Sequence, residues 1–174
     1  MFQEHHHEWL RAFNRNLFGY ARALCSEAAE DLYQEALVRA MSAKCVPAEP
    51  STFRIWMFQV LRNLWIDQLR ARTRVQSHVA SGLETAEAYA NTEGEDAIVS
   101  RLAVREAFMQ LSRDHREVLA LVDIGGFSYD ETGALLSVPR GTVMSRVSRA
   151  RAALLDRLTT DVVIPFRRRH KAVR

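Results

Sequence analysis

The sequence predicts an all-α protein made of two small helical domains joined by a flexible linker. Leu, Ala, Arg and Glu dominate its 174 residues, which include only 7 Gly and 4 Pro. Apolar residues recur at spacings of three and four along much of the chain, as they do in helices that bury one face. Residues 75–95 break this pattern with small, polar and acidic side chains. Because a chain of this length can divide its core in two, we expect one domain on each side of that stretch.

An N-terminal bundle of three helices is predicted in the first domain, residues 8–74. The first helix covers 8–24, where aromatic and leucine residues recur every three or four positions. Ser26 is the expected N-cap of the second helix, which should stop before Pro47. The third helix, from about 51 to 73, is apolar almost all round in its first four turns. It is therefore expected either to pack on several sides or to present aromatic rings to a partner.

Residues 75–95 are predicted to form a flexible acidic linker between two basic regions. The stretch 75–100 contains five acidic residues and no Lys or Arg, a net charge of −5. By contrast, 52–74 has five Arg and one Asp, a net charge of +4, and 139–174 has nine Arg, one Lys and two Asp, a net charge of +8. This distribution indicates two surfaces that contact a polyanion. The basic tail, 161–174, is expected to be disordered or to contact phosphate loosely.

Four helices are predicted in the second domain, residues 96–160. The first covers 96–110 and is expected to bury Ile98, Leu102 and Phe108. Ser112 is the expected N-cap of the next helix, which ends at a Gly-Gly pair because a left-handed backbone position favours glycine.

The last two helices of this domain have the pattern of a helix-turn-helix. Ser128 is the expected N-cap of the shorter helix, and a two-residue step of Ser137 and Val138 follows it. Pro139 then opens the final helix at a position where a missing N–H does no harm. Two short helices joined by so tight a turn are typical of the helix-turn-helix motif.

The final helix carries a candidate DNA-contacting face. On a helical wheel, Val143, Val147, Ala150 and Leu154 form a narrow apolar stripe, and hydroxyl and guanidinium groups lie opposite it. Such a face fits the DNA major groove, where Arg binds guanine and Ser or Thr binds base edges or phosphate. The alternative is a solvated basic face on a structural helix. The candidate residues are Arg140, Thr142, Ser145, Arg146, Arg149 and Arg151.

The sequence offers no sign of catalysis, a cofactor or a metal site. No nucleophile–base constellation or phosphate-binding glycine loop is present, so the protein is not expected to be an enzyme. The histidines at 5–7 are consecutive and lack the i, i+4 spacing of metal ligands. Cys25 and Cys45 form no CxxC pair and are expected to be reduced and buried. Without an apolar run of about 18 residues or a signal peptide, the chain is expected to be cytoplasmic and not inserted in a membrane.

Three stretches resemble the sigma-70 family of RNA polymerase sigma factors, specifically its extracytoplasmic-function (ECF) group. LSRDHREVLALVDIGGFSYDETGALLSVPRGTVMSRVSRARAAL resembles the region that recognises the −35 promoter element. AEDLYQEALVRAM resembles the segment that docks on the polymerase clamp, and FRIWMFQVLRNLWIDQLRARTR resembles the segment that reads the −10 element. Together the resemblances cover about 11–73 and 96–158. They imply a sigma factor with region 2 at 8–74 and region 4 at 96–160.

The resemblance also implies roles for particular residues. The DNA-contacting face of the final helix would read the −35 element. The loop at 44–52, together with Asn63, would capture a base flipped out during melting. The candidates for stacking on this base are Trp56, Phe58 and Trp65. Arg74 and other arginines of the same helix would hold phosphates. The −10 residues implied are Trp56, Arg62, Asn63, Arg70 and Arg72.

The partners implied are core RNA polymerase, through its clamp and flap regions, promoter DNA and an anti-sigma factor. Asp31, Gln34 and Glu35 would contact the clamp. Two positions depart from the family pattern: Ser137 stands where Gly is frequent, and Gly133 stands where Ala is common. Each departure is expected to cost up to about 1 kcal/mol.

Two other functions remain open at this point. One is a sigma-like decoy that occupies an anti-sigma factor and never engages DNA, although the basic recognition face argues against it. The other is a two-domain transcriptional regulator with a ligand pocket in its first half, which the basic, aromatic-rich helix makes less suitable as a small-molecule container.

Overall fold

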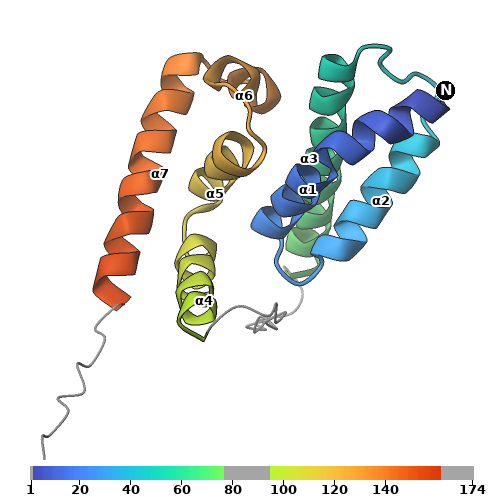
Figure 1. The fold of residues 1–174 in the computed structure, drawn as a ribbon. Helices are drawn as coiled ribbons and strands as arrows, with labels where there is room; N and C mark the ends of the chain where they lie inside the picture. The colour runs from blue at the N-terminus through green and yellow to red at the C-terminus, as the bar shows by residue number, and fades with distance from the viewer. Residues whose placement is uncertain (1, 77–94, 162–174) are drawn as a thin grey trace, which may run out of the picture.

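The computed structural model describes the backbone of residues 2–76 and 95–161, and the predicted all-α class is confirmed. Most of the expected linker and nearly all of the basic tail lie outside the described residues. The first domain contains α1 (Glu4–Leu24), α2 (Ala29–Met41) and α3 (Pro50–Gln76) (Figure 1). The second contains α4 (Glu95–Met109), α5 (Arg113–Leu119), the π-helical turn η1 (Ala120–Ile124), α6 (Tyr129–Leu136) and α7 (Arg140–Asp161).

The first helix begins four residues earlier than expected because its N-terminus is capped. The backbone N–H of Gln3 donates to Nδ1 of His6 over 2.9 Å, and the backbone N–H of His6 donates to the carbonyl of Gln3 over 3.0 Å. With its Nδ1 accepting, His6 uses Nε2–H to donate to the carbonyl of Pro47 over 3.1 Å. His6 is buried beside Phe2 and Phe53, so this histidine caps and packs the helix. Among the described residues, no group of three or more His, Cys, Asp or Glu side chains could hold a metal ion.

Two further expectations about the first domain are wrong. Ser26 is not the N-cap of α2, because that helix begins at Ala29 after Ala28, and the Ser26 hydroxyl instead accepts a hydrogen bond from Arg105 of α4. Cys45 is exposed rather than buried, whereas Cys25 is half-buried. Burial raises the pKa of Cys25 to about 11, although Arg72 and Arg116 oppose the shift. Both cysteines are free thiols.

The structure explains why α3 is apolar almost all round. Phe53 and Met57 are buried in the core, while Phe58 meets Phe127 of the second domain with ring centroids 4.7 Å apart. Trp65 lies under the guanidinium of Arg113 from α5. The helix therefore packs on several sides, one of them against the other domain.

The second domain contains a π turn that the sequence did not predict. Ser112 caps α5 as expected, accepting from the N–H of His115. The helix then widens, and the N–H of Gly125 bonds the carbonyl of Ala120 over 2.7 Å. Gly126 follows at a φ of +71°, the left-handed conformation expected there. In α4, Phe108 is half-buried but Leu102 is 36% exposed, so the expected burial of Leu102 is wrong, and the side chain of Ile98 lies outside those described.

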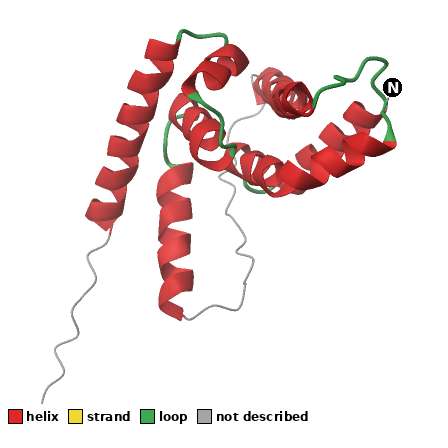
Figure 2. Cartoon of the chain, turned by 45° about the horizontal axis from the view of Figure 1, so that its top comes forward, coloured by secondary structure: helices red, strands yellow, loops and turns green. Residues whose placement is uncertain are grey.

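The two domains lie against each other through α1 and α3 on one side and α5, η1 and α6 on the other. The last helix, α7, packs on α4, α5 and α6 and lies on the far side of the second domain (Figures 1 and 2). None of the helices that the structure describes is both long enough and apolar enough to cross a membrane.

Candidate nucleic-acid interface

The shorter helix of the helix-turn-helix, α6, begins at a reciprocal cap. The Ser128 hydroxyl accepts from the N–H of Glu131 over 3.2 Å, and the Glu131 carboxylate accepts from the N–H of Ser128 over 2.8 Å. The Glu131 carboxylate also accepts from the Ser128 hydroxyl over 2.8 Å, and the two bonds it accepts lower the pKa of Glu131 from its usual value, the bond from the backbone N–H of Ser128 most. The predicted Ser128 cap is confirmed, and it fixes where the motif starts.

The turn between α6 and α7 explains both departures from the family pattern. Ser137 adopts a left-handed backbone with φ +56°, which is why glycine is favoured at this position. Gly133 lies so close to the turn that an added Cβ would be 2.8 Å from the carbonyl oxygen of Val138. The N–H of Val138 also bonds the Gly133 carbonyl over 2.9 Å. The expectation that Gly133 simply weakens the helix is therefore wrong, because this close approach leaves no room for Ala.

The recognition helix, α7, is anchored by the predicted apolar stripe. The carbonyl of Pro139 accepts from the N–H groups of Thr142 and Val143, so Pro139 precedes the first helical residue, Arg140. Val143, Val147 and Ala150 are almost fully buried. This packing fixes the rotation of α7 and turns its opposite face outward.

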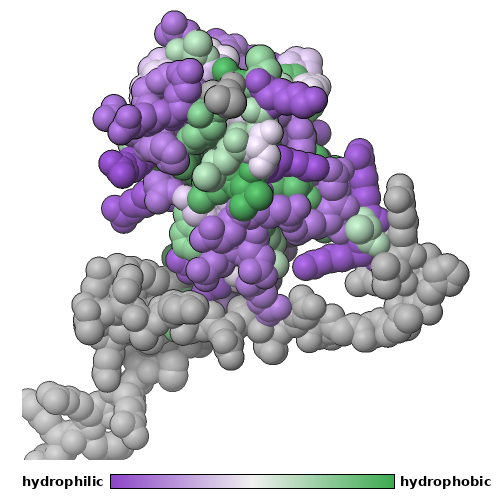
Figure 3. Space-filling view, turned by 90° about the vertical axis from the view of Figure 1, so that its right-hand side faces the viewer, coloured by the Kyte–Doolittle hydropathy of each residue, from purple (hydrophilic) through white to green (hydrophobic). Residues whose placement is uncertain are grey.

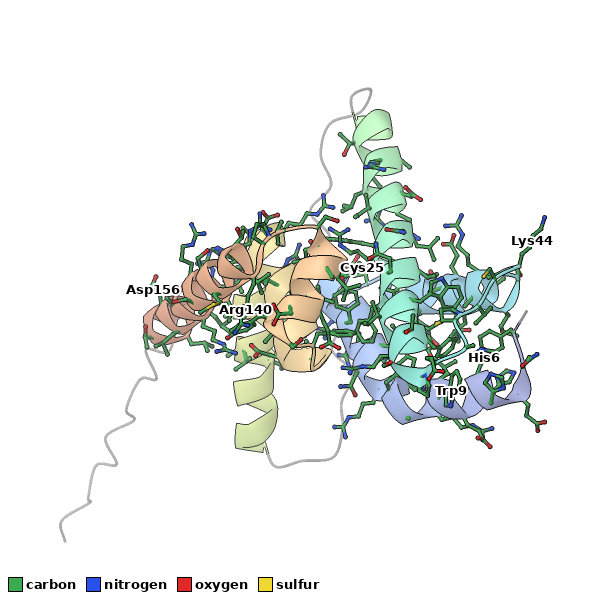
Figure 4. The ribbon with its side chains drawn as sticks, turned by 90° about the horizontal axis from the view of Figure 1, so that it is seen from above. His6, Trp9, Cys25, Lys44, Arg140 and Asp156 are labelled. Atoms are coloured by element: carbon green, nitrogen blue, oxygen red, sulfur yellow. The ribbon has the colours of Figure 1, made fainter. Side chains whose placement is uncertain are left out.

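The outward face carries the candidate −35 residues; Figure 4 labels two residues of the helix, Arg140 at its start and Asp156 toward its other end. Ser145 and Arg149 are exposed, and Nε of Arg149 bonds the carbonyl of Ser145 over 3.2 Å. Thr142 is half-buried at the edge of the face.

Three arginines of this group form ion pairs with nearby acids. Arg140 pairs with Asp130 over 3.1 Å, Arg146 with Asp114 over 3.3 Å and Arg151 with Asp123 over 2.6 Å. Most of these side chains are well exposed, and surface pairs contribute only about 0–1 kcal/mol each. Replacing such an acid by a DNA phosphate or a base edge therefore costs little.

The candidate −10 residues are spread along α3 in different environments. Asn63 is exposed and accepts from Nε2 of Gln59 over 2.9 Å, and Trp56 is half-buried. Nε of Arg62 pairs with Oε1 of Glu117 over 2.7 Å, and the Arg62 side chain is only 18% exposed. Arg62 is thus occupied by the second domain in this arrangement.

The rest of this group divides into exposed cations and buried rings. Arg70 and Arg72 are exposed near the end of the helix, where Arg70 lies 3.6 Å from Asp67. Phe58 and Trp65 are buried, so neither ring is open to a base in this arrangement. The side chain of Arg74 lies outside the described side chains.

An open pocket of about 390 Å³ lies between α1 and the start of α3. It includes Pro50 and Ser51 from the loop expected to capture a flipped base, but Asn63 does not line it. Asn16 and Arg54, which do line it, both hydrogen-bond to backbone carbonyls of the second domain. In this pocket, the loop residues Pro50 and Ser51 therefore lie beside side chains that contact the second domain and not beside Asn63.

The candidate polymerase-contacting residues share one exposed face of α2. Asp31, Gln34 and Glu35 are all exposed, and Glu35 accepts from Nε2 of Gln68 over 3.1 Å. The face continues with Val38 and Met41, which are 63% and 54% exposed. Figure 3 views the first domain from outside and shows apolar surface set among polar side chains. The sequence analysis missed Val38 and Met41. Their helical spacing was a signal, because apolar side chains three or four positions from a residue of the acidic face lie on that same face.

Sequence profiles match both domains in the expected order. The profile described as "Sigma-70 region 2" matches residues 2–75, and "Sigma-70, region 4" matches residues 101–154. The chain is 36% identical over 152 residues to "ECF RNA polymerase sigma factor EcfG" of Rhodopseudomonas palustris, covering 87% of this chain and 80% of that protein. It is 31% identical over 159 residues to "ECF RNA polymerase sigma factor SigM" of Mycobacterium tuberculosis, covering 88% and 79%.

A solved structure shares the arrangement of both domains. The sigma factor RpoE from Bartonella quintana, crystallised with the anti-sigma factor NepR, matches with a TM-score of 0.75 and 29% identity over 91% of this chain and 99% of that chain.

A helix-turn-helix with an exposed basic face, following a second helical domain, defines a DNA-binding transcription protein. The chain belongs to the sigma-70 family, within its ECF group, and members of this family initiate transcription without being enzymes.

Proposed function

We propose that this protein directs core RNA polymerase to specific promoters, reading the −35 element with α7 and melting the −10 element with α3. The observation that carries the proposal is the exposed face of hydroxyls and arginines on α7, held outward by the buried stripe of Val143, Val147 and Ala150. A decoy that only titrates an anti-sigma factor would have no need of this face.

At the −35 element, Ser145 and Arg149 are the central contacts. Both are exposed on the first turns of α7, and the N-terminal part of a recognition helix is the part that enters the major groove. Arg146 joins them by exchanging Asp114 for a base edge. The phosphates around this centre are bound by Arg140, Thr142 and Arg151. These contacts fix the register of the helix on the DNA.

At the −10 element, Asn63 and Trp56 take the flipped base, and Arg70 and Arg72 hold the backbone. An aromatic ring stacked on a base contributes about 1–3 kcal/mol, which offsets the cost of unstacking. Arg62 joins the phosphate contacts once it is released from Glu117. These assignments rest on exposure and on the family resemblance.

The face of α2 binds the clamp of the polymerase. Asp31, Gln34 and Glu35 supply polar contacts, and the adjacent Val38 and Met41 supply the apolar area that a stable interface needs. The second domain contacts the flap. The protein acts in the cytoplasm, where its polymerase and promoters are. An anti-sigma factor is expected to control it, because RpoE of Bartonella quintana is bound to NepR in its solved structure.

In vitro transcription with core polymerase and a promoter library tests the proposal. A sigma factor yields transcripts from a subset of promoters that share two elements, whereas a decoy yields none. For the polymerase contact, Glu35→Ala and Val38→Ser should each weaken core binding, and Glu8→Ala, an exposed charge on another helix, should not. Equal binding by all three variants would rule out the α2 face.

A further inference from the structure

The loop that joins α2 to α3, residues 42–49, is held by α1 as well as by the two helices that it joins. At its start the N–H of Ser42 bonds a carbonyl of α2, and at its end the carbonyl of Glu49 accepts from an N–H of α3. Between these ends, the carbonyl of Pro47 accepts from Nε2–H of His6 over 3.1 Å. Figure 1 shows the loop beside the start of α1. A residue 41 positions earlier in the chain therefore fixes part of the loop.

The donor role of His6 follows from the contact that its other ring nitrogen makes. The backbone N–H of Gln3 lies 2.9 Å from Nδ1, and an N–H can only donate. The ring proton is therefore on Nε2, the nitrogen that faces the Pro47 carbonyl. A ring held at both nitrogens cannot rotate or change its tautomer without breaking a bond. His6 is thus a rigid bridge between the start of α1 and the loop.

Burial makes this bridge hard to break. The His6 side chain belongs to a residue that is only 3% exposed, and its ring centroid lies 5.1 Å from that of Phe2 and 5.2 Å from that of Trp9. Figure 4 labels His6 and Trp9 on the same helix. A buried N–H that loses its acceptor has no water to replace it, so the free energy favours the bond to the loop.

The same ring also supports the tryptophan proposed to stack on the flipped base. Phe53 is fully buried, and its ring centroid lies 5.0 Å from that of His6 and 5.8 Å from that of Trp56. Trp56 itself is half-buried. Because protein cores are closely packed, a displaced ring at His6 would move Phe53 and, through it, Trp56. His6 therefore lies behind two elements assigned to base capture, the loop and Trp56.

We propose that His6 is a positioning residue for base capture at the −10 element. It holds the loop through its hydrogen bond to Pro47, and through Phe53 it keeps the ring of Trp56 in a fixed position relative to that loop. This inference rests on the proposed sigma function and deepens it at the −10 site. A base held between a loop and a ring loses contact when either one moves. Loss of the bridge should therefore reduce discrimination between bases at −10 and leave −35 binding unchanged.

Four variants separate the hydrogen bonds of His6 from its bulk. His6→Phe keeps an aromatic ring and removes both bonds, and His6→Leu does the same with a smaller side chain. His6→Gln can keep both, because Gln at the third position of a helix accepts from the N-cap N–H and its amide can donate to the loop. His7→Phe makes the same change at the exposed neighbouring histidine and is the matched control.

NMR relaxation of the full chain tests whether His6 holds the loop. In His6→Phe and His6→Leu, the order parameters of the Val46 and Ala48 amides should fall from about 0.85 to below about 0.6, the range of a flexible backbone. They should stay high in His6→Gln and His7→Phe. Thermal unfolding checks that each variant is folded at the temperature used. Unchanged order parameters in His6→Phe and His6→Leu would overturn the proposal, and an equal fall in His6→Gln would overturn the role of the hydrogen bonds.

Binding of the holoenzyme to single-stranded oligonucleotides tests base capture. The oligonucleotides carry the −10 sequence selected from the promoter library, with each base replaced in turn. The preference at the captured position should fall by about fivefold in His6→Phe and persist in His6→Gln and His7→Phe, while binding to −35 duplex stays the same. Full preference in His6→Phe would overturn the role in base capture. A parent holoenzyme without preference at any −10 position would instead count against the proposed function, and the order parameters would still show whether His6 holds the loop.

Discussion

The ring of Phe58 in the first domain meets the ring of Phe127 in the second edge to face, with centroids 4.7 Å apart and planes at 86°. Both rings are buried, and the guanidinium of Arg54 lies over the Phe127 ring, 4.3 Å from its centroid. Aromatic pairs of this geometry contribute about 0.5–1.5 kcal/mol beyond the area they bury. Two domains that share such a pair should unfold together.

Phe127→Ala is expected to reduce the free energy of unfolding by about 3–5 kcal/mol and to split one thermal transition into two. The substitution leaves a cavity between the domains and removes the partner of Phe58. Differential scanning calorimetry measures both effects. Met144→Ala, at a half-exposed position on α7, should change stability by no more than about 0.5 kcal/mol. A single, barely shifted transition for Phe127→Ala would show that the ring does not couple the domains.

Arg149→Ala is expected to cost about 1–3 kcal/mol in promoter binding and to relax the preference at one −35 position, if this guanidinium reads guanine. Arg146→Ala should have a similar effect of smaller size, since Arg146 must first leave Asp114. Binding of the holoenzyme to a set of −35 variants gives the measurement. Arg11→Ala, which removes the same charge from α1, controls for net charge. Unchanged base preference in both variants would exclude these arginines from base reading.

Ser137→Gly is expected to stabilise the second domain by about 0.5–1 kcal/mol, because Ser137 has a left-handed backbone that glycine adopts without penalty. The same change at Ser148, in the exposed middle of α7, should destabilise by about 0.5 kcal/mol. Urea unfolding of the two variants should therefore give shifts of opposite sign. Destabilisation by both would mean that the turn does not constrain Ser137.

Gly133→Ala is expected to destabilise the protein by about 1–3 kcal/mol, although Ala is the better helix former. The new methyl would meet the Val138 carbonyl at 2.8 Å, and the turn into α7 would have to move. Thermal unfolding measures the loss, and weaker −35 binding should accompany it. Ala134, an exposed neighbour, provides the control as Ala134→Ser. A gain in stability for Gly133→Ala would contradict the close approach.

Acidification should weaken the α6 cap. Hydrogen bonds from Ser128 lower the pKa of Glu131 in the folded state, so the charged carboxylate contributes stability above its unfolded value of about 4.5. That contribution is lost as the pH falls through the lowered value. The stability difference between the parent and Glu131→Gln should thus be constant above about pH 5 and shrink below pH 4.5. Glu27→Gln is the exposed control, and a difference that grows on acidification would contradict the cap.

Much of the fold and of the −35 site could be predicted from local signals. Ser112 and Ser128 were recognised as caps because a hydroxyl before a helix satisfies the first free N–H groups. The stripe of Val143, Val147 and Ala150 follows from helical geometry alone, and it defines the opposite face. These features depend on residues within a few positions of one another.

Other features depended on neighbours distant in sequence. Ser26 resembles an N-cap, yet its hydroxyl accepts from Arg105, which is 79 positions away. His6 gained its role from the carbonyl of Pro47. The family resemblance predicts a phosphate contact for Arg62, and no local pattern indicates that Glu117 binds it. The acceptor in each case comes from another segment of the folded chain.

The sequence by itself determined the class of the protein, the order of its helices and the face of α7 turned outward, because helical periodicity and capping are properties of short segments. Only the tertiary structure decided how the domains meet, which arginines are occupied and why Gly133 and Ser137 matter. Those outcomes depend on contacts between residues far apart in the chain. Such contacts form only in the folded state, where packing offsets the conformational entropy that the chain loses.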